Sequence, residues 1–222
     1  MNLSLALYTK LGEGRCLIHV GREGQDQGAD REGGDPKLSV PQALLLTGPP
    51  GSGKTTLLQQ VVTQLGGRAG GFYTTELRAQ GRRVGFEIVT LAGERGRLAH
   101  VQCASPYRVG RYGVDLDALE RVGVSALRRA ITTGQLVVVD EIGRMELGSA
   151  AFRDTVLEAL AGGAWLLGTI LQPAHPWADD LKRDRRVLVL RVTRSAWDAV
   201  RRDVLTWVGA LPGLEPGSAE AK

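Results

Sequence analysis

Residues 48–55 read Gly-Pro-Pro-Gly-Ser-Gly-Lys-Thr and match the phosphate-binding pattern G-x-x-x-x-G-K-[ST]. Glycines let backbone N–H groups turn toward anionic oxygens, and the N-terminus of a following helix adds a positive dipole end. In this pattern Lys54 reaches the β- and γ-phosphates, and the hydroxyl of Thr55 is a ligand for Mg²⁺. The loop therefore predicts binding of a nucleoside triphosphate. The predicted nucleotide-binding residues are Gly48, Pro49, Pro50, Gly51, Ser52, Gly53, Lys54, Thr55 and Thr56.

A second group of reactive side chains follows the most apolar, β-branched stretch of the chain, residues 136–139. Asp140 and Glu141 come directly after it, as in a Walker B strand. There the first carboxylate holds Mg²⁺, usually through a water, and the second orients or deprotonates the attacking water. We predict Thr55 and Asp140 as metal ligands, and Lys54 and Glu141 as catalytic residues. Two solvated acids at the end of a buried strand are the alternative interpretation.

Phosphoryl transfer also needs a cation that neutralises charge developing on the γ-phosphate. Arg144, three residues after the acidic pair, and Arg111, in the sequence Val-Gly-Arg-Tyr, are the candidates. For each of them, an exposed arginine without a catalytic role is the alternative.

The stretches around these motifs predict alternating strands and helices. Residues 43–47 are apolar and predict a buried parallel strand before the loop, with a helix after it. Residues 72–78, 83–91 and 98–101 predict an antiparallel meander. Further strands are expected at 136–139, 165–170 and 187–192, and helices at 115–131, 149–160, 177–183 and 195–211. Ser149 is predicted to cap one helix, and Ser195 to open the last one in a capping box.

This order predicts an α/β P-loop NTPase fold, RecA/AAA-like. We expect a three-layer sandwich with a mixed, mainly parallel sheet and an inserted antiparallel meander. The nucleotide is expected at the carboxyl ends of the parallel strands. Residues 41–211 form this predicted domain. Residues 1–40 predict an N-terminal extension with two short strands (1–8 and 15–20) and a flexible glycine-rich linker, and residues 212–222 a frayed tail.

Composition restricts the class of protein further. The 222 residues carry a net charge of +4, and Cys16 and Cys103 lack metal-site or disulfide-framework spacing. A reducing cytoplasm is therefore expected. No apolar run approaches the roughly 18 residues of a membrane-spanning helix, and no secretory signal is recognisable. No basic stripe with interleaved aromatic residues supports a nucleic-acid partner. A monomer is expected because the candidate arginines belong to the same chain as the loop.

Five segments carry a resemblance to a known family. They are LTGPPGSGKTTL (46–57), GGFYTTELRAQGRRVGFEIVTL (70–91), RVGRYGVDL (108–116), VVVDEIGRMEL (137–147) and HPWADDLKRDRRVLVLRVTR (175–194). In this order they resemble the small nucleoside-triphosphatases first described in thermophiles, which include a human cancer-related nucleoside-triphosphatase. The loop is widespread, whereas GFYTTE followed by GRRVGF and DEIGRMEL is specific to the family.

The resemblance implies slow, Mg²⁺-dependent hydrolysis of ATP, GTP, CTP and UTP to diphosphate and phosphate. It places Arg111 and Arg144 where the family is expected to carry lysine or arginine. Thr75 stands where an acid is expected, so a role for that acid is in question here. The extension before residue 41 lies outside the resemblance.

Two other functions remain open on the sequence. A nucleotide or small-molecule kinase uses the same loop but passes the γ-phosphate to an acceptor other than water. A nucleotide-dependent switch or nucleic-acid-binding module uses hydrolysis only to time an interaction, and predicts that a partner stimulates it.

Overall fold

The computed structural model describes residues 5–11, 15–21 and 40–213. Strands β1 (Leu5–Leu11) and β2 (Arg15–Gly21) pair antiparallel as a sheet of their own, where two short strands were predicted. The predicted linker, apart from its first residue Gly21 in β2, lies outside the described residues, as does the predicted tail from residue 214 onward.

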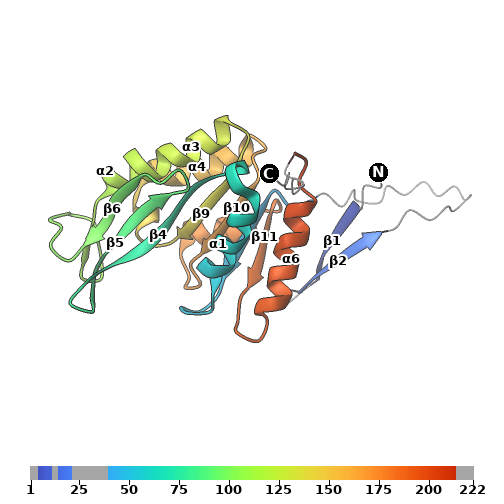
Figure 1. Ribbon diagram of the computed structural model, residues 1–222, viewed down its shortest axis with the longest axis horizontal. Helices are drawn as coiled ribbons and strands as arrows, with labels where there is room; N and C mark the ends of the chain where they lie inside the picture. Colours follow the sequence, from blue (N-terminus) through green and yellow to red (C-terminus); the bar gives the residue numbers. More distant parts are fainter. Residues whose placement is uncertain (1–4, 12–14, 22–39, 214–222) are drawn as a thin grey trace, which may run out of the picture.

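All remaining strands form one nine-stranded sheet in the order β11-β3-β10-β9-β4-β5-β6-β8-β7 (Figure 1). Neighbours from β11 to β4 are parallel, and neighbours from β4 to β7 are antiparallel. The sheet is therefore mixed, as predicted. The strands are β3 (Ala43–Thr47), β4 (Ala69–Ala79), β5 (Arg82–Thr90), β6 (Arg95–His100), β7 (Arg108–Val109), β8 (Tyr112–Val114), β9 (Leu136–Ile142), β10 (Leu166–Ile170) and β11 (Val187–Arg191).

The antiparallel meander extends one edge of the sheet instead of interrupting the parallel strands. Its first strand, β4, also pairs in parallel with β9, so that Tyr73 lies beside Asp140. The short hairpin β7–β8 continues the meander and was not predicted. Its strands of two and three residues are too short for an alternating pattern to reveal them.

Helices cover both faces of the sheet. Helices α1 (Lys54–Leu65) and α6 (Trp197–Gly209) pack on one face, and α3 (Ser125–Thr132), α4 (Ala150–Ala161) and α5 (Pro176–Arg183) on the other (Figure 1). Strand β3 shows why, because successive side chains point to opposite faces. Leu44 and Leu46 join the cluster with α1 and α6, whereas Ala43 and Leu45 join the opposite one. The predicted three layers are confirmed.

The helix predicted over residues 115–131 is present but is not regular. Asp115 caps its first turn, α2 (Leu116–Ala118), by accepting the Ala118 N–H at 2.8 Å. A π-helical segment, η2 (Leu119–Val124), then leads into α3. A Cβ on Gly123 would lie 3.1 Å from the ring of Phe72, so the glycine lets this segment approach β4 closely. Short 3₁₀ turns, η1 (Gly66–Arg68) and η3 (Glu146–Gly148), follow α1 and β9.

The two predicted serine caps have different outcomes. Ser149 caps α4, because its Oγ accepts the Phe152 N–H at 3.0 Å. The capping box at Ser195 is wrong. Helix α6 begins after Ala196, whose N–H is bound by the hydroxyl of Thr193 at 3.2 Å. The Ser195 hydroxyl lies 3.2 Å from that of Thr193, and no side chain caps the N-terminus of α6.

Replacing Ser149 with alanine is expected to lower the free energy of unfolding by about 1–2 kcal/mol, the usual cost of losing an N-cap. Ser149 is buried, and its Oγ also donates to Glu120 Oε1 at 2.7 Å, so both groups lose a partner. Urea unfolding measures the effect. Ser195→Ala is the matched control and is expected to change stability by less than about 0.5 kcal/mol. An equal loss in both variants would contradict the cap assignment.

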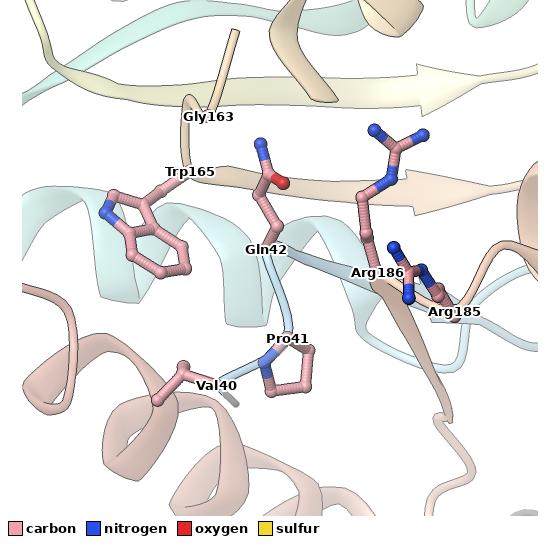
Figure 2. Close-up of a pocket in the computed structure, with 7 residues that line it drawn as sticks. All are labelled: Val40, Pro41, Gln42, Gly163, Trp165, Arg185 and Arg186. Atoms are coloured by element: carbon pink, nitrogen blue, oxygen red, sulfur yellow. The ribbon is translucent and has the colours of Figure 1, made fainter. Parts of the chain in front are cut away.

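The chain enters the main sheet beside a cavity of about 450 Å³ at the amino-terminal edge of β3, β10 and β11. Figure 2 shows the Gln42 amide between Trp165 and the two arginines. That amide donates to the carbonyls of Ala159, Leu160 and Ala164 at 2.8–3.2 Å. Arg186 is held by Asp184 through two contacts of 2.7 and 3.0 Å. These polar groups thus connect the segment before β3 to the turn between α4 and β10. They lie at the amino-terminal ends of the strands, and the glycine loop lies at the opposite ends.

Within the described residues, none of the helices is both long and apolar enough to cross a membrane.

Candidate active site

The glycine loop connects β3 to α1, and two of its glycines are required by their surroundings. Gly48 has a φ of +148°, and a Cβ there would lie 2.3 Å from the carbonyl oxygen of Val192. Gly53 has a φ of +91°, and a Cβ there would lie 2.7 Å from Nε1 of Trp197. That indole N–H donates to the Gly53 carbonyl at 3.2 Å, so the start of α6 packs against the loop and supports it.

Lys54 opens α1 and curls back over the loop. Its ammonium group donates to the carbonyls of Gly48 at 2.9 Å and Pro49 at 3.1 Å. Oxygens of a bound phosphate would compete for the same donors. The lysine is therefore placed at the mouth of the loop, where its charge can meet an anion.

Buried polar atoms without a hydrogen-bond partner gather at this edge of the sheet. Among the described residues they are Thr47 Oγ1, Ser52 Oγ and His175 Nδ1. Thr47 ends β3, Ser52 lies in the loop, and His175 precedes α5. Leaving a buried polar group unpaired costs about 1–3 kcal/mol. Three such atoms near the carboxyl ends of the parallel strands indicate a site that a polar ligand or water completes.

Asp140 lies in β9, next to β10 and two strands away from β3. It is 3% exposed, and the hydroxyl of Thr169 in β10 donates to its Oδ1 at 2.5 Å. Burial raises the pKa of this carboxyl, and hydrogen bonds from Thr169 and Thr55 oppose the shift. The effect of Thr55 on this pKa places its hydroxyl, in the first turn of α1, near the carboxylate, so the two predicted metal ligands lie close together. The Asp140–Glu141 peptide bond is cis.

Glu141 is half-buried beside Asp140. Burial raises its pKa, the charge of Asp140 adds to the shift, and Lys54 opposes it. Glu141 lines a cavity of about 280 Å³ together with Arg144 and Glu146. Glu146 is buried and accepts the Gly143 N–H at 3.1 Å. Burial, reinforced by the charge of Glu141, raises the pKa of Glu146 to about 8.

This raised pKa makes stability depend on pH. Glu146 titrates at 4.5 in the absence of burial, so between pH 4.5 and 8 the folded protein keeps a proton that the unfolded chain has lost. The stabilisation is complete below pH 4.5 and is lost as the pH rises toward 8. One such proton gives a slope of up to about −1.4 kcal/mol per pH unit.

Glu146→Gln stays neutral at every pH and keeps an acceptor for Gly143. Its free energy of unfolding is therefore expected to fall less than that of the wild type between pH 5 and pH 8. Urea unfolding at several pH values tests this, with Glu158→Gln, an exposed glutamate on α4, as the control. Parallel pH profiles for the wild type and Glu146→Gln would show that Glu146 does not hold this proton.

The structure places the two candidate arginines differently. Arg144 is exposed and lines the cavity with Glu141, while its carbonyl accepts the Tyr107 hydroxyl at 2.6 Å. Arg111 lies in the turn of the β7–β8 hairpin, donates to the carbonyl of Arg83, and stands 5.2 Å from the ring centre of Tyr112. Arg144 is thus brought beside Glu141, whereas the contacts of Arg111 lie within the antiparallel edge.

Three residues of the site were missed by the sequence analysis: Thr169, Glu146 and Trp197. A threonine near the end of an apolar strand was a usable signal for Thr169. Its meeting with Asp140 depends on β10 lying between β3 and β9, which no local pattern gives.

A glycine loop between a buried strand and a helix, with an Asp-Glu pair on a nearby parallel strand, defines a P-loop protein of the three-layer α/β class. Comparisons with known proteins narrow this class. A family model described as "NTPase" matches residues 43–205, and the chain belongs to this family.

Relatives of the chain carry nucleoside-triphosphatase names. Nucleoside-triphosphatase THEP1 of Thermotoga sp. (strain RQ2) is 40% identical over 163 residues, covering 73% of this chain and 93% of the relative. The human cancer-related nucleoside-triphosphatase is 41% identical over 181 residues, covering 74% and 95%. The crystal structure of THEP1 from Aquifex aeolicus superimposes with a TM-score of 0.68 at 33% identity, covering 74% of this chain and 97% of that one. The P-loop fold and the resemblance are both confirmed.

Proposed function

We propose that this chain hydrolyses nucleoside triphosphates to nucleoside diphosphate and phosphate, with Mg²⁺ and with little preference for the base. The observation that carries the proposal is that the glycine loop with Lys54 and Thr55 follows β3, while Asp140, held by Thr169, and Glu141 lie on β9 at the same end of the parallel strands. A hydroxyl, a metal-binding carboxylate, a cation and a second carboxylate are the groups that phosphoryl transfer to water needs.

The donor set fits Mg²⁺. This ion prefers oxygen ligands and is usually bound by one or two protein groups, with waters and substrate phosphates completing its shell. Thr55 and Asp140 offer two oxygens, and the described residues hold no cluster of three or more His, Cys, Asp or Glu side chains suited to a metal. A bound Mg²⁺ would neutralise charge on the β- and γ-phosphates.

The remaining steps belong to the chain's own residues. Backbone N–H groups of the loop and the ammonium of Lys54 hold the triphosphate. Glu141 takes the proton of the attacking water, for which its raised pKa is suited, since a base works best with a pKa nearer to the working pH. Arg144, beside Glu141, is the better placed candidate for neutralising charge on the γ-phosphate, with Arg111 second.

Four finer points belong to the same proposal. Broad base specificity is proposed from the family resemblance. It is also proposed because all the groups identified in the site would act on the phosphates or the metal, and none on the base. A monomer is proposed because loop, acids and candidate arginines come from one chain. Action in the cytoplasm rests on cysteine usage, and the absence of a nucleic-acid partner on the absence of a basic, aromatic stripe in the sequence.

Phosphate release from ATP, GTP, CTP and UTP, with Mg²⁺ or with EDTA, tests the proposal. We expect release from all four in Mg²⁺ and none in EDTA. A panel of nucleoside monophosphates added to parallel reactions tests the kinase alternative. Release that requires one monophosphate, with its diphosphate appearing, would replace the proposal by a nucleotide kinase. Addition of RNA or DNA tests the switch, which predicts stimulation.

A further inference from the structure

The cavity beside Glu141 is larger than hydrolysis requires. A water molecule occupies about 30 Å³ of liquid volume, whereas the cavity measures about 280 Å³. An enzyme that passes phosphate only to water needs room for one attacking molecule. The size therefore leaves space for a second, larger substrate next to the proposed base.

The position of the cavity separates it from the triphosphate. In the sheet order β3-β10-β9-β4, the glycine loop follows β3, and Glu141 lies on β9. The cavity walls come from β4 to β7 and from the segments that follow β9 and β10. Glu141 thus stands between the phosphate loop on one side and the cavity on the other.

The walls are mainly apolar, with a few polar residues among them. Phe86, Leu98, Val109 and Met145 contribute the apolar surface. The polar side chains of the lining belong to Thr74, Glu141, Arg144 and Glu146. An apolar chamber with a few convergent polar groups is the usual form of a small-molecule site. Water gains nothing from such walls, whereas the body of an organic molecule does.

We propose that this cavity is an acceptor site for a small alcohol with an apolar body, to which the enzyme transfers the γ-phosphoryl group. The inference rests on the proposed function, because it uses the same phosphate loop and the same Glu141. Phe86, Leu98 and Val109 hold the apolar body, and the hydroxyl group faces Glu141.

The step balances with the groups present. The alcohol oxygen forms a bond to the γ-phosphorus, and the bond from that phosphorus to the oxygen bridging to the β-phosphate breaks. Glu141 takes the hydroxyl proton, and the nucleoside diphosphate leaves with the bridging electron pair. The products are a phosphate monoester and the diphosphate, in place of inorganic phosphate and the diphosphate.

The test uses two alcohols of opposite character in the presence of Mg·ATP. Benzyl alcohol has an apolar body that suits the walls, and glycerol is a polar comparison at the same concentration. Phosphorus NMR measures each monoester against inorganic phosphate. We expect the ratio of benzyl phosphate to inorganic phosphate to be at least 10-fold higher than the ratio of glycerol phosphate to inorganic phosphate. Inorganic phosphate alone, or esters formed equally from both alcohols, would overturn the acceptor site while leaving hydrolysis established.

Two variants locate the acceptor. Val109→Phe fills part of the cavity and is expected to lower the ratio of benzyl phosphate to inorganic phosphate at least 5-fold. Val40→Phe makes the same change beside the cavity at the opposite end of the sheet and is expected to keep the wild-type ratio. An unchanged ratio in Val109→Phe would contradict the location. Absence of both ester and inorganic phosphate in the wild type would instead overturn the proposed function together with this inference.

Discussion

Glu141→Gln is expected to lower the rate of phosphate release by about 10²-fold or more, the usual contribution of a general base. Glutamine keeps the size of the side chain and its hydrogen-bonding ability, but it cannot take a proton from water. The phosphate loop and Asp140 are unchanged, so the affinity for Mg·ATP should remain nearly that of the wild type. Phosphate release under single-turnover conditions and titration with a fluorescent ATP analogue measure the two quantities.

The control for this variant is Glu158→Gln, which removes the same charge from an exposed position on α4. It should hydrolyse ATP at the wild-type rate. If Glu141→Gln does so as well, the assignment of Glu141 as the base is wrong. A large loss of ATP affinity in Glu141→Gln would instead point to a role for this carboxylate in binding.

Lys54→Ala is expected to weaken triphosphate binding and hydrolysis together. A hydrogen bond to a charged group contributes about 1.5–3 kcal/mol, which corresponds to a roughly 10- to 100-fold loss of affinity. Loss of one preorganised donor in the transition state costs a further fall in rate, about 10²-fold in comparable sites. Lys54 also holds the loop through Gly48 and Pro49, so part of the loss comes from a less ordered loop.

Lys182→Ala makes the same charge change away from the loop, because Lys182 pairs with Asp179 on α5 at 3.0 Å. Its affinity for the ATP analogue should match that of the wild type. Undiminished binding by Lys54→Ala would show that Lys54 does not hold the triphosphate. The two site variants thus separate binding from chemistry, since only Lys54→Ala should change affinity strongly.

The sequence predicted the parts of the fold that depend on local chemistry. The glycine loop requires backbone conformations and close approaches that only glycine permits, as at Gly48 and Gly53. The positions of its glycines in the sequence therefore predict its geometry. The buried strands β3 and β9 read as apolar runs because both of their faces are covered by helices. Ser149 capped its helix as predicted, since capping involves groups only three residues apart.

Errors arose at the exact start of a helix and where the pairing of distant strands decided the outcome. Ser195 does not cap α6, because the helix begins one residue later, after Ala196, and the Ser195 hydroxyl lies against that of Thr193. The hairpin β7–β8 forms because β8 pairs with β6, and its strands are too short for a sequence pattern to predict them.

The sequence by itself determined which groups can bind phosphate and metal and which strand ends they follow. Tertiary structure decided which of them meet. The order β11-β3-β10-β9-β4 brings Thr169 to Asp140, places Trp197 against the glycine loop and buries Glu146 beside Glu141. It also left a cavity between the meander and the acidic pair. The physical reason is that spacing along a chain fixes local geometry, whereas strand order and burial follow from packing over the whole sheet.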